Sequence, residues 1–341
     1  MKRKNGIAPI GAPGIPQRGR ESEDIYYIDE CRAKYGSEVY PIDRFVEVFQ
    51  VEENVWALKA TGPSKMLDGN WQYLIEGPER ALCIDNGYGV GNLKGLCEQL
   101  VHGKEVLCAV THSHIEHASG SHQWDKIYSH KFCADNLEKN QATGNDHFLG
   151  SNMDKKGRRS IIKDEDLVPV RPYACVHMEN HECINLGEDY DIELIHVGGH
   201  TPGLAVFLDK KGRALYTGDA AFEQLDVGLG IGLDLRGEKG RFLHEGYMDI
   251  HYYAEQLNAL AERIDEYDVC RDGHGSIDSP SRVIPDLRDA IYATIEDPHA
   301  YTQEIKGWFG TSYIMTRGIA NCRYNDPDTV VDMYILDETN K

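Results

Sequence analysis

The chain of 341 residues contains no long hydrophobic run. None of its apolar stretches approaches the roughly 18 residues that a membrane-spanning helix needs. The start is basic like a secretory leader, but no apolar run of about seven residues follows it, which disfavours export by that route. We therefore expect a soluble, cytoplasmic protein without a membrane partner.

Cysteine pairs at metal-binding or redox spacing are also missing. The nine cysteines show no Cys-x-x-Cys spacing, and several, such as Cys83 and Cys108, lie inside apolar, strand-like runs. An odd number of cysteines in such surroundings is typical of reduced, buried thiols. This agrees with a reducing cytoplasm.

Positive charge is scarce relative to negative charge. The chain has 36 Lys and Arg against 56 Asp and Glu, a formal net charge of −20. Such a balance opposes binding to phosphate backbones and anionic membranes. We expect a small-molecule substrate and no nucleic-acid partner, and a nuclease is disfavoured.

Short apolar runs bounded by turn residues predict two sets of sheet strands. The first set is RFVEVFQV, NVWALKA, WQYLIEG and ALCIDNG, and the second is YDIELIHV, LAVFLD and RALYT. Apolar spacing predicts helices over 92–101, 247–265 and 283–296, and residues 105–111 read as a buried strand. The pattern indicates a mixed α/β chain.

Three parts are expected along the chain. Residues 1–40 form an extended or flexible N-terminal arm, because glycine and proline crowd its first half, and this arm offers a route to a homo-oligomer. Residues 41–298 form the catalytic domain, and residues 299–341 form a C-terminal cap or edge segment. The polar stretches 139–166 and 222–253 are candidates for loops that select the substrate.

The sequence THSHIEHASG, at 111–120, holds three histidines and a glutamate within six residues. His112, His114, Glu116 and His117 follow a predicted strand at its C-terminal end, where rigid scaffolds often present chemistry. Imidazole and carboxylate suit divalent first-row metals, zinc in particular. Four such side chains cannot all reach one small ion in good geometry, so the cluster predicts a two-metal site.

Three other predicted strands end in further metal donors. HVGGHTPG offers His200, YTGDAA offers Asp219, and DGHG, after the short predicted strand YDVC at 267–270, offers His274. Each is a weak signal by itself, because a lone histidine in a glycine turn is more often structural. Together, each at the end of a strand, they complete two coordination sets.

The order of these motifs resembles the metallo-β-lactamase superfamily over about residues 45–295. Asp85 in the run ALCIDNG is similar to an aspartate that ends an early strand in this family. The resemblance implies that Asp85 supports the metal ligands without being one of them. The resemblance implies a four-layer αβ/βα sandwich of the metallo-β-lactamase type with metals at one edge of its two sheets. It assigns the first cation to His112, His114 and His200, the second to Glu116, His117 and His274, and the bridge between them to Asp219.

The function that the resemblance implies is that of a dinuclear metal hydrolase. A hydroxide shared by two cations would attack a small ester, thioester or lactone. Zinc is the first expectation for both divalent ions, with manganese or iron as alternatives. Glu116 is the predicted catalytic residue, because it is placed to hold the water or pass a proton.

Glu116 also departs from the family pattern, which usually has aspartate at this position. The additional methylene moves the carboxylate by on the order of 1.5 Å. This displacement affects how well the second metal position is occupied and which metal it prefers. Two other readings stay open. One is an iron-dependent redox enzyme of the same fold, similar to a persulfide dioxygenase, and the other is a metal-binding sensor without catalysis. A secreted lactamase is disfavoured by the missing leader.

Overall fold

The computed structural model describes residues 23–60, 70–144, 166–221, 242–307, 310–324, 326–328 and 330–331. The chain divides into two compact units. The first comprises residues 1–129, 137–176 and 185–191, and the second comprises residues 130–136, 177–184 and 192–341. None of the helices in the described ranges has both the length and the apolar character needed to cross a membrane.

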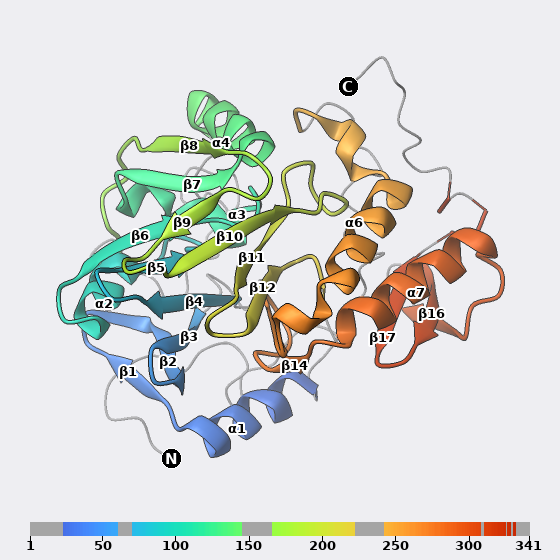
Figure 1. The fold of residues 1–341 in the computed structure, drawn as a ribbon, viewed down its shortest axis with the longest axis horizontal. Helices are drawn as coiled ribbons and strands as arrows, with labels where there is room; N and C mark the ends of the chain where they lie inside the picture. Colours follow the sequence, from blue (N-terminus) through green and yellow to red (C-terminus); the bar gives the residue numbers. More distant parts are fainter. Residues whose placement is uncertain are drawn as a thin grey trace. The chain divides into compact units, whose positions relative to one another are not determined.

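The first unit contains a mixed sheet whose strand order follows the sequence from β1 to β8 (Figure 1). Strands β1 to β5 pair antiparallel, whereas β5, β6 and β7 run parallel. The strands are β1 (Glu38–Tyr40), β2 (Asp43–Glu52), β3 (Val55–Ala60), β4 (Trp71–Glu76), β5 (Arg80–Ile84), β6 (Glu105–Ala109), β7 (Lys126–His130) and β8 (Ala174–Met178). β3 is buried along its whole length and β5 is buried after its first residue. The predicted strands of this region are therefore confirmed.

Helix α2 begins where the sequence provides a cap and an apolar face. The Asn92 side chain accepts a hydrogen bond from the Gly95 amide, and four residues at helical spacing in α2 are buried. The elements are α1 (Glu23–Tyr35), α2 (Leu93–Leu100), α3 (Ile115–Ala118), the 3-10 helix η1 (Ser119–Gln123) and α4 (Lys131–Thr143). α4 covers the start of the predicted polar loop, while 145–165 and 222–241 lie outside the described residues.

The prediction of an extended arm over residues 1–40 is wrong for residues 23–35, which form α1. Ile28 and Cys31 of this helix are buried, and the Arg32 guanidinium binds both carboxylate oxygens of Glu47 on β2 at 3.0 Å. Tertiary contacts of this kind stabilise a helix whose own pattern is weak. Residues 1–22 lie outside the described part, so the remaining arm and the three-part division stay predictions.

The second unit contains a six-stranded sheet in the order β14-β13-β12-β11-β10-β9. Its strands are β9 (Cys183–Asn185), β10 (Asp191–His196), β11 (Ala205–Asp209), β12 (Ala214–Gly218), β13 (Val269–Asp272) and β14 (Ser279–Pro280). β12 and β13 are parallel, and β10 to β12 are antiparallel. β11 and β12 are buried throughout, in agreement with their apolar sequences.

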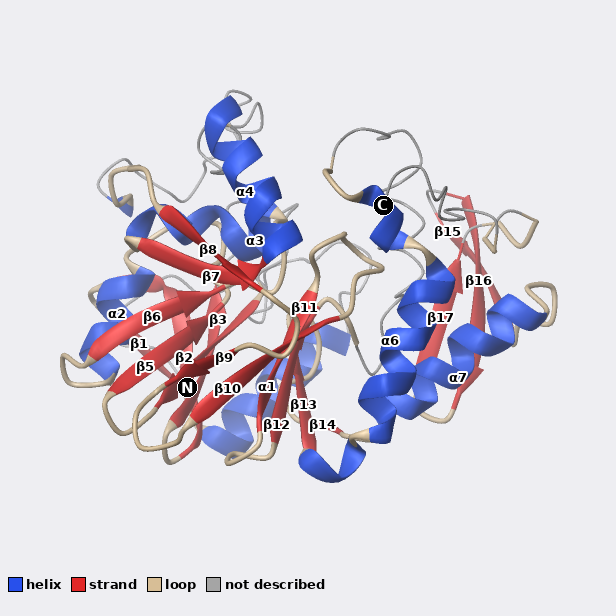
Figure 2. Ribbon diagram, turned by 45° about the horizontal axis from the view of Figure 1, so that its top comes forward, coloured by secondary structure: helices blue, strands red, loops and turns tan. Residues whose placement is uncertain are grey.

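Helices and a smaller sheet complete the second unit (Figure 2). The helices are η5 (Glu245–Met248), α6 (Ile250–Glu262), η6 (Ile264–Glu266) and α7 (Val283–Glu296), and the antiparallel strands are β15 (Gln303–Gly307), β16 (Gly310–Arg317) and β17 (Ala320–Tyr324). α7 has the predicted bounds and contacts β16 and β17. Leu257, Leu287 and Met315 belong to one buried core that joins the helices to this sheet.

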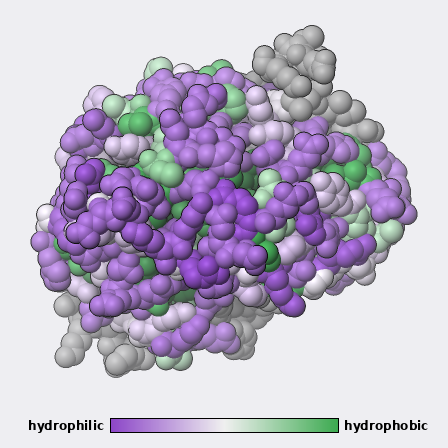
Figure 3. Space-filling view, in the orientation of Figure 1, coloured by the Kyte–Doolittle hydropathy of each residue, from purple (hydrophilic) through white to green (hydrophobic). Residues whose placement is uncertain are grey.

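The cysteines and the surface agree with the composition. All nine cysteines are free thiols and seven are buried, and burial raises the pKa of Cys108. The expectation of buried thiols is therefore met at seven positions, whereas Cys175 is partly exposed and Cys183 is exposed. The face shown in Figure 3 is mainly hydrophilic, with hydrophobic side chains scattered over it. Such scattering is usual for a folded protein.

Candidate metal centre

The histidine cluster of the first unit follows β6, as predicted, and its second half forms α3. His112 and His117 are fully buried, and His114 is almost so. The ring centroids of His112 and His117 are 4.3 Å apart, and those of His112 and His114 are 4.7 Å apart. Neutral imidazole is the form in which histidine binds a metal, so three adjacent rings offer a set of metal donors.

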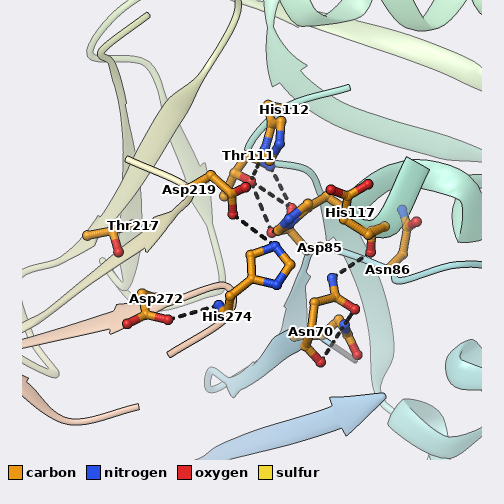
Figure 4. A network of polar contacts seen from close by, with 12 residues as sticks. Asn70, Asp85, Asn86, Thr111, His112, His117, Thr217, Asp219, Asp272 and His274 are labelled. Carbon is orange, nitrogen blue, oxygen red and sulfur yellow. Dashed lines mark hydrogen bonds and ion pairs between the residues drawn. The ribbon is translucent and has the colours of Figure 1, made fainter. Parts of the chain in front are cut away.

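Asp85 orients this cluster from the end of β5 (Figure 4). Its φ of 62° turns the chain sharply. One carboxylate oxygen accepts the Thr111 amide at 2.7 Å, and the other accepts Nδ1–H of His117 at 2.8 Å. Because Nδ1 of His117 is held in this way, Nε2 is the ring nitrogen directed away from Asp85 and suited to a metal.

The backbone of the motif is fastened to the segment that follows β5. The Asn86 amide donates to the His117 carbonyl at 2.8 Å, and the Gly120 amide donates to the Gly87 carbonyl at 3.1 Å. A Cβ at Gly120 would lie 2.2 Å from the Asn86 carbonyl oxygen. The last residue of THSHIEHASG is therefore glycine because the two backbones approach closely.

Glu116 lies on α3 with a partly exposed side chain. One of its carboxylate oxygens is within 4.8 Å of a ring nitrogen of His117. Its backbone carbonyl accepts a hydrogen bond from the side-chain amide of Asn70, which fixes the helix position. The structure thus brings together the four candidate ligands of the first unit.

In the second unit, His200 lies in the loop that follows β10. Gly198 and Gly199 have positive φ values of 65° and 78°, which only glycine adopts freely. His196 spans the loop, since its Nε2–H donates to the Pro202 carbonyl at 2.8 Å and its Nδ1 accepts from the Tyr252 hydroxyl at 2.9 Å. Burial lowers the pKa of His196 to about 4, so this neutral tautomer persists at neutral pH.

Asp219, after β12, lies between His200 and His274. His200 Nε2 is 3.2 Å from one carboxylate oxygen, and His274 Nε2 is 3.4 Å from the other. Two donors bound to one zinc at about 2.0–2.1 Å with tetrahedral angles lie about 3.3 Å apart. Both separations therefore fit ligands that share an ion, and each oxygen of Asp219 faces its own histidine.

Asp272 shapes the loop that carries His274 (Figure 4). Its carboxylate accepts the His274 amide at 2.9 Å and the Ser276 amide at 2.8 Å. The Gly273 amide donates to the Gly218 carbonyl at 2.9 Å, which fastens the loop to the end of β12 next to Asp219. The second unit thus brings together His200, Asp219 and His274.

Several residues that hold the proposed ligands were not predicted from the sequence. Thr111 contacts both Asp85 and His112, Asn70 supports Glu116, and Asp272 supports His274. Only Asp272 carried a usable signal, because aspartate commonly accepts hydrogen bonds from the backbone of a glycine-rich turn. The roles of Thr111 and Asn70 depend on contacts between segments.

Comparisons with known proteins identify the family. The family description "metallo-beta-lactamase superfamily" matches residues 67–274, more than half of the chain. An acyl-coenzyme A thioesterase of Bos taurus is 24% identical over 162 residues, covering 44% of this chain and 58% of that protein. A hydroxyacylglutathione hydrolase of Haemophilus influenzae is 25% identical over 162 residues, covering 47% of this chain and 70% of that protein.

Solved structures show the same fold. A beta-lactamase domain protein from Burkholderia ambifaria has a TM-score of 0.51 at 18% identity, covering 76% of this chain and 80% of that one. A metallo-beta-lactamase family protein from Thermus thermophilus has a TM-score of 0.50 at 18% identity, covering 72% and 82%. These likenesses confirm the predicted α/β sandwich fold, and the donor groups suit divalent metals. Sequence and fold together show that the chain belongs to the metallo-β-lactamase superfamily.

Proposed function

We propose that the chain is a metal-dependent hydrolase that cleaves an acyl thioester. The observation that carries the proposal is the Asp219 carboxylate, whose oxygens lie 3.2 and 3.4 Å from His200 and His274. This donor set suits divalent cations that activate water rather than a structural role for the histidines.

The sequence left esters, thioesters and lactones as candidate substrates. The names of two relatives favour a thioester among these three classes. One relative is an acyl-coenzyme A thioesterase, and the other is a hydroxyacylglutathione hydrolase. Both names denote an acyl group carried on sulfur. The match spans 58% of the thioesterase's length, so the substrate class comes to this chain as a proposal.

The proposed ligands are those of the family resemblance: His112, His114, Glu116, His117, His200, Asp219 and His274. Two divalent cations, zinc first, would supply a water with a pKa near about 7 and polarise the acyl carbonyl. Asp85 binds the His117 ring, and Thr111 donates a hydrogen bond to the same Asp85 carboxylate, so the ring is oriented before any substrate binds. His196 and Tyr252 fix the loop that presents His200.

Glu116 is proposed to hold the attacking water or to pass a proton to the leaving group. Glu116→Gln removes both the charge and the proton transfer, so we expect kcat to fall by about 10²–10⁴-fold. Glu116→Asp keeps the carboxylate and restores the residue usual in the family, so kcat should fall much less in this variant. Steady-state kinetics with a thioester measures kcat of both variants. Equal activity of the two variants would remove Glu116 from the mechanism.

The experiment that tests the function combines metal content with a matched substrate panel. The protein is expressed without added metal and with zinc, manganese or iron, and its metals are counted by elemental mass spectrometry. The same acyl group is then offered as a coenzyme A thioester, a glutathione thioester and an oxygen ester, beside a lactone.

We expect about two zinc or manganese ions per chain and the fastest turnover with a thioester. His200→Ala should lose metal and activity together, whereas His299→Ala, an exposed histidine outside the ligand set, should keep both. Iron as the dominant metal, together with oxygen consumption, would instead favour an iron-dependent redox enzyme of the same fold. Negligible metal under every supply would overturn the hydrolase.

A further inference from the structure

Three ring-bearing side chains of the second unit gather into one cluster. Phe132 lies in the first turn of α4, His244 directly precedes η5, and Tyr247 lies within η5. The ring centroid of Phe132 is 4.3 Å from that of His244 and 4.5 Å from that of Tyr247. Rings from two distant segments of the chain thus form one surface, which we call the ring surface.

The ring surface is open to solvent. Phe132 and Tyr247 are half-buried, and the side chain of His244 is 34% exposed. Leu243, which precedes His244 in the chain, is 41% exposed. Apolar side chains that cluster at a surface point to a ligand or a partner, whereas single scattered ones need no explanation.

Both segments that supply the rings pack on the loop that carries His200. The Tyr247 carbonyl accepts the Gly199 amide at 2.9 Å. A Cβ at Gly203 would lie 2.1 Å from the amide nitrogen of Cys133, the residue after Phe132. The ring surface is therefore continuous with a loop that presents a proposed metal ligand.

Contacts within the second unit hold the rings in position before a ligand binds. The side-chain oxygen of Asn136 accepts the Leu243 amide at 2.8 Å, and its amide donates to the Leu243 carbonyl at 3.3 Å. The Phe132 ring also lies 4.8 Å from the ring of His130, which is buried. Order of this kind lowers the entropic cost of binding.

Charged groups at the edge of the ring surface are engaged with one another. Lys131 Nζ lies 5.4 Å from the centre of the Phe132 ring and binds the Glu179 carboxylate at 2.7 Å. His244 Nε2 is 2.6 Å from a carboxylate oxygen of Asp135. These pairs balance charge at the edge, so the interaction that the rings offer to a ligand is apolar contact.

We propose that the ring surface binds the apolar part of the substrate's acyl group. This inference rests on the proposed thioester hydrolysis and adds the class of acyl group, which is a long aliphatic or an aromatic acyl rather than a short hydroxyacyl group. Contact with the rings holds such a group beside the His200 loop, where the proposed reaction takes place. His244 and Tyr247 fall within 222–253, a stretch that the sequence marked as a candidate for substrate selection.

The first test compares acyl groups on one carrier. Acetyl, lactoyl, hexanoyl and decanoyl thioesters of coenzyme A are compared by kcat/KM in wild type, Phe132→Ser and Tyr247→Ser. The second substitution leaves the bond to Gly199 in place, because that bond uses the Tyr247 backbone. Tyr292→Ser is the control, since Tyr292 is an aromatic residue of α7 that is 41% exposed.

We expect kcat/KM of wild type to rise with acyl length. The ratio of kcat/KM for decanoyl to that for acetyl should fall by about 10-fold in each ring variant, the effect of losing one ring contact, and should stay unchanged in Tyr292→Ser. A purely structural role of the rings would lower the rates for all acyl groups equally. An unchanged ratio in both ring variants would therefore overturn the proposal.

The second test measures binding without turnover. The purified full chain is titrated with cis-parinaric acid, a fluorescent fatty acid, and Kd should rise by about 10-fold in Phe132→Ser and in Tyr247→Ser but not in Tyr292→Ser. Ring-dependent binding by a protein that cleaves no thioester would uphold the ring surface and overturn the proposed function. Hydrolysis with an unchanged acyl ratio would do the reverse. Because Phe132 and Tyr247 lie on separate segments, a folding defect in one variant leaves the other to decide.

Discussion

Individual residues outside the proposed ligand set hold the proposed ligands in position. Asp85 fixes His117 through its Nδ1, and Thr111 contacts the same carboxylate. Asp272 accepts the backbone amides of the loop that carries His274. Partners of this kind set the orientation of a ligand before the ion arrives, and their loss typically weakens metal binding by about 10–100-fold.

Asp85→Asn should therefore lower zinc affinity by about 10–100-fold, because an amide cannot accept from both Thr111 and His117 as the carboxylate does. Competition with a chromophoric chelator measures this affinity. Asp125→Asn is the matched control, since Asp125 is exposed and pairs with Arg171. Unchanged affinity in Asp85→Asn would show that the hydrogen bonds to Asp85 do not matter for binding.

His196 provides a prediction about pH. Burial lowers its pKa from 6.5 to about 4, so between these values the unfolded chain binds a proton that the folded chain does not. The stability that His196 contributes is complete above pH 6.5 and is lost as the pH falls to about 4. The total is on the order of 3 kcal/mol at about 1.4 kcal/mol per pKa unit.

Urea unfolding of wild type and His196→Gln from pH 7 to pH 4 measures this contribution. The free energy of unfolding should fall less steeply with decreasing pH in the variant. His299→Gln, which replaces an exposed histidine, should follow the wild-type curve. Parallel curves for wild type and His196→Gln would contradict the assignment.

At the scale of elements, the proposed ligands lie in the segments that follow β6, β10, β12 and β13, and two of them, Glu116 and His117, are on α3. Neighbouring residues closely constrain the loop after β10. A Cβ at Gly199 would lie 2.6 Å from the Tyr253 ring, and one at Gly203 would lie 2.1 Å from the Cys133 amide nitrogen. Close packing against α6 and α4 thus holds the shape of the loop that presents His200.

Gly199→Ala should destabilise the protein more than Gly103→Ala. Both glycines have positive φ, 78° and 84°, so both substitutions share the backbone cost of about 1–2 kcal/mol. Only Gly199 also meets a ring, because a Cβ at Gly103 has no neighbour within 4 Å. Gly199→Ala should therefore lose about 1–3 kcal/mol more free energy of unfolding than Gly103→Ala, as at other overpacked sites. Urea unfolding measures both values, and equal losses in the two variants would contradict the prediction.

At the scale of the whole molecule, the proposed ligands are distributed over both units, four in the first and three in the second. Histidines buried for metal binding contribute to stability mainly when the ion is present. An ion that binds only the folded chain at a concentration of 100 times its Kd adds about 2.7 kcal/mol.

Removal of metal by a chelator should therefore lower Tm, and added zinc should restore it. The His200→Ala variant should respond much less, because it lacks a proposed ligand. Circular dichroism during heating, with and without chelator, measures the change. The same Tm in wild type with and without metal would mean that the proposed ligands do not bind an ion under these conditions.

The helix α7 and the strands were predictable because their apolar spacing is strong and local. Val283–Glu296 coincides with the predicted helix 283–296. Helix α1 was missed because its stability depends on Arg32 bound to Glu47 and on buried Ile28, which a charged stretch of sequence does not reveal. Where local pattern is weak, distant contacts decide the structure.

The sequence by itself determined which residue types stand at the ends of the strands. The motifs THSHIEHASG, GGHTPG, TGD and GHG supply imidazole and carboxylate donors. These donors indicate metal binding from sequence alone, because the preference of a donor for a metal is a property of its side chain. Only the tertiary structure decided which atoms meet. The pairing of Asp85 with His117 and of each Asp219 oxygen with its own histidine follows from sheet register and loop packing, which residue spacing does not encode.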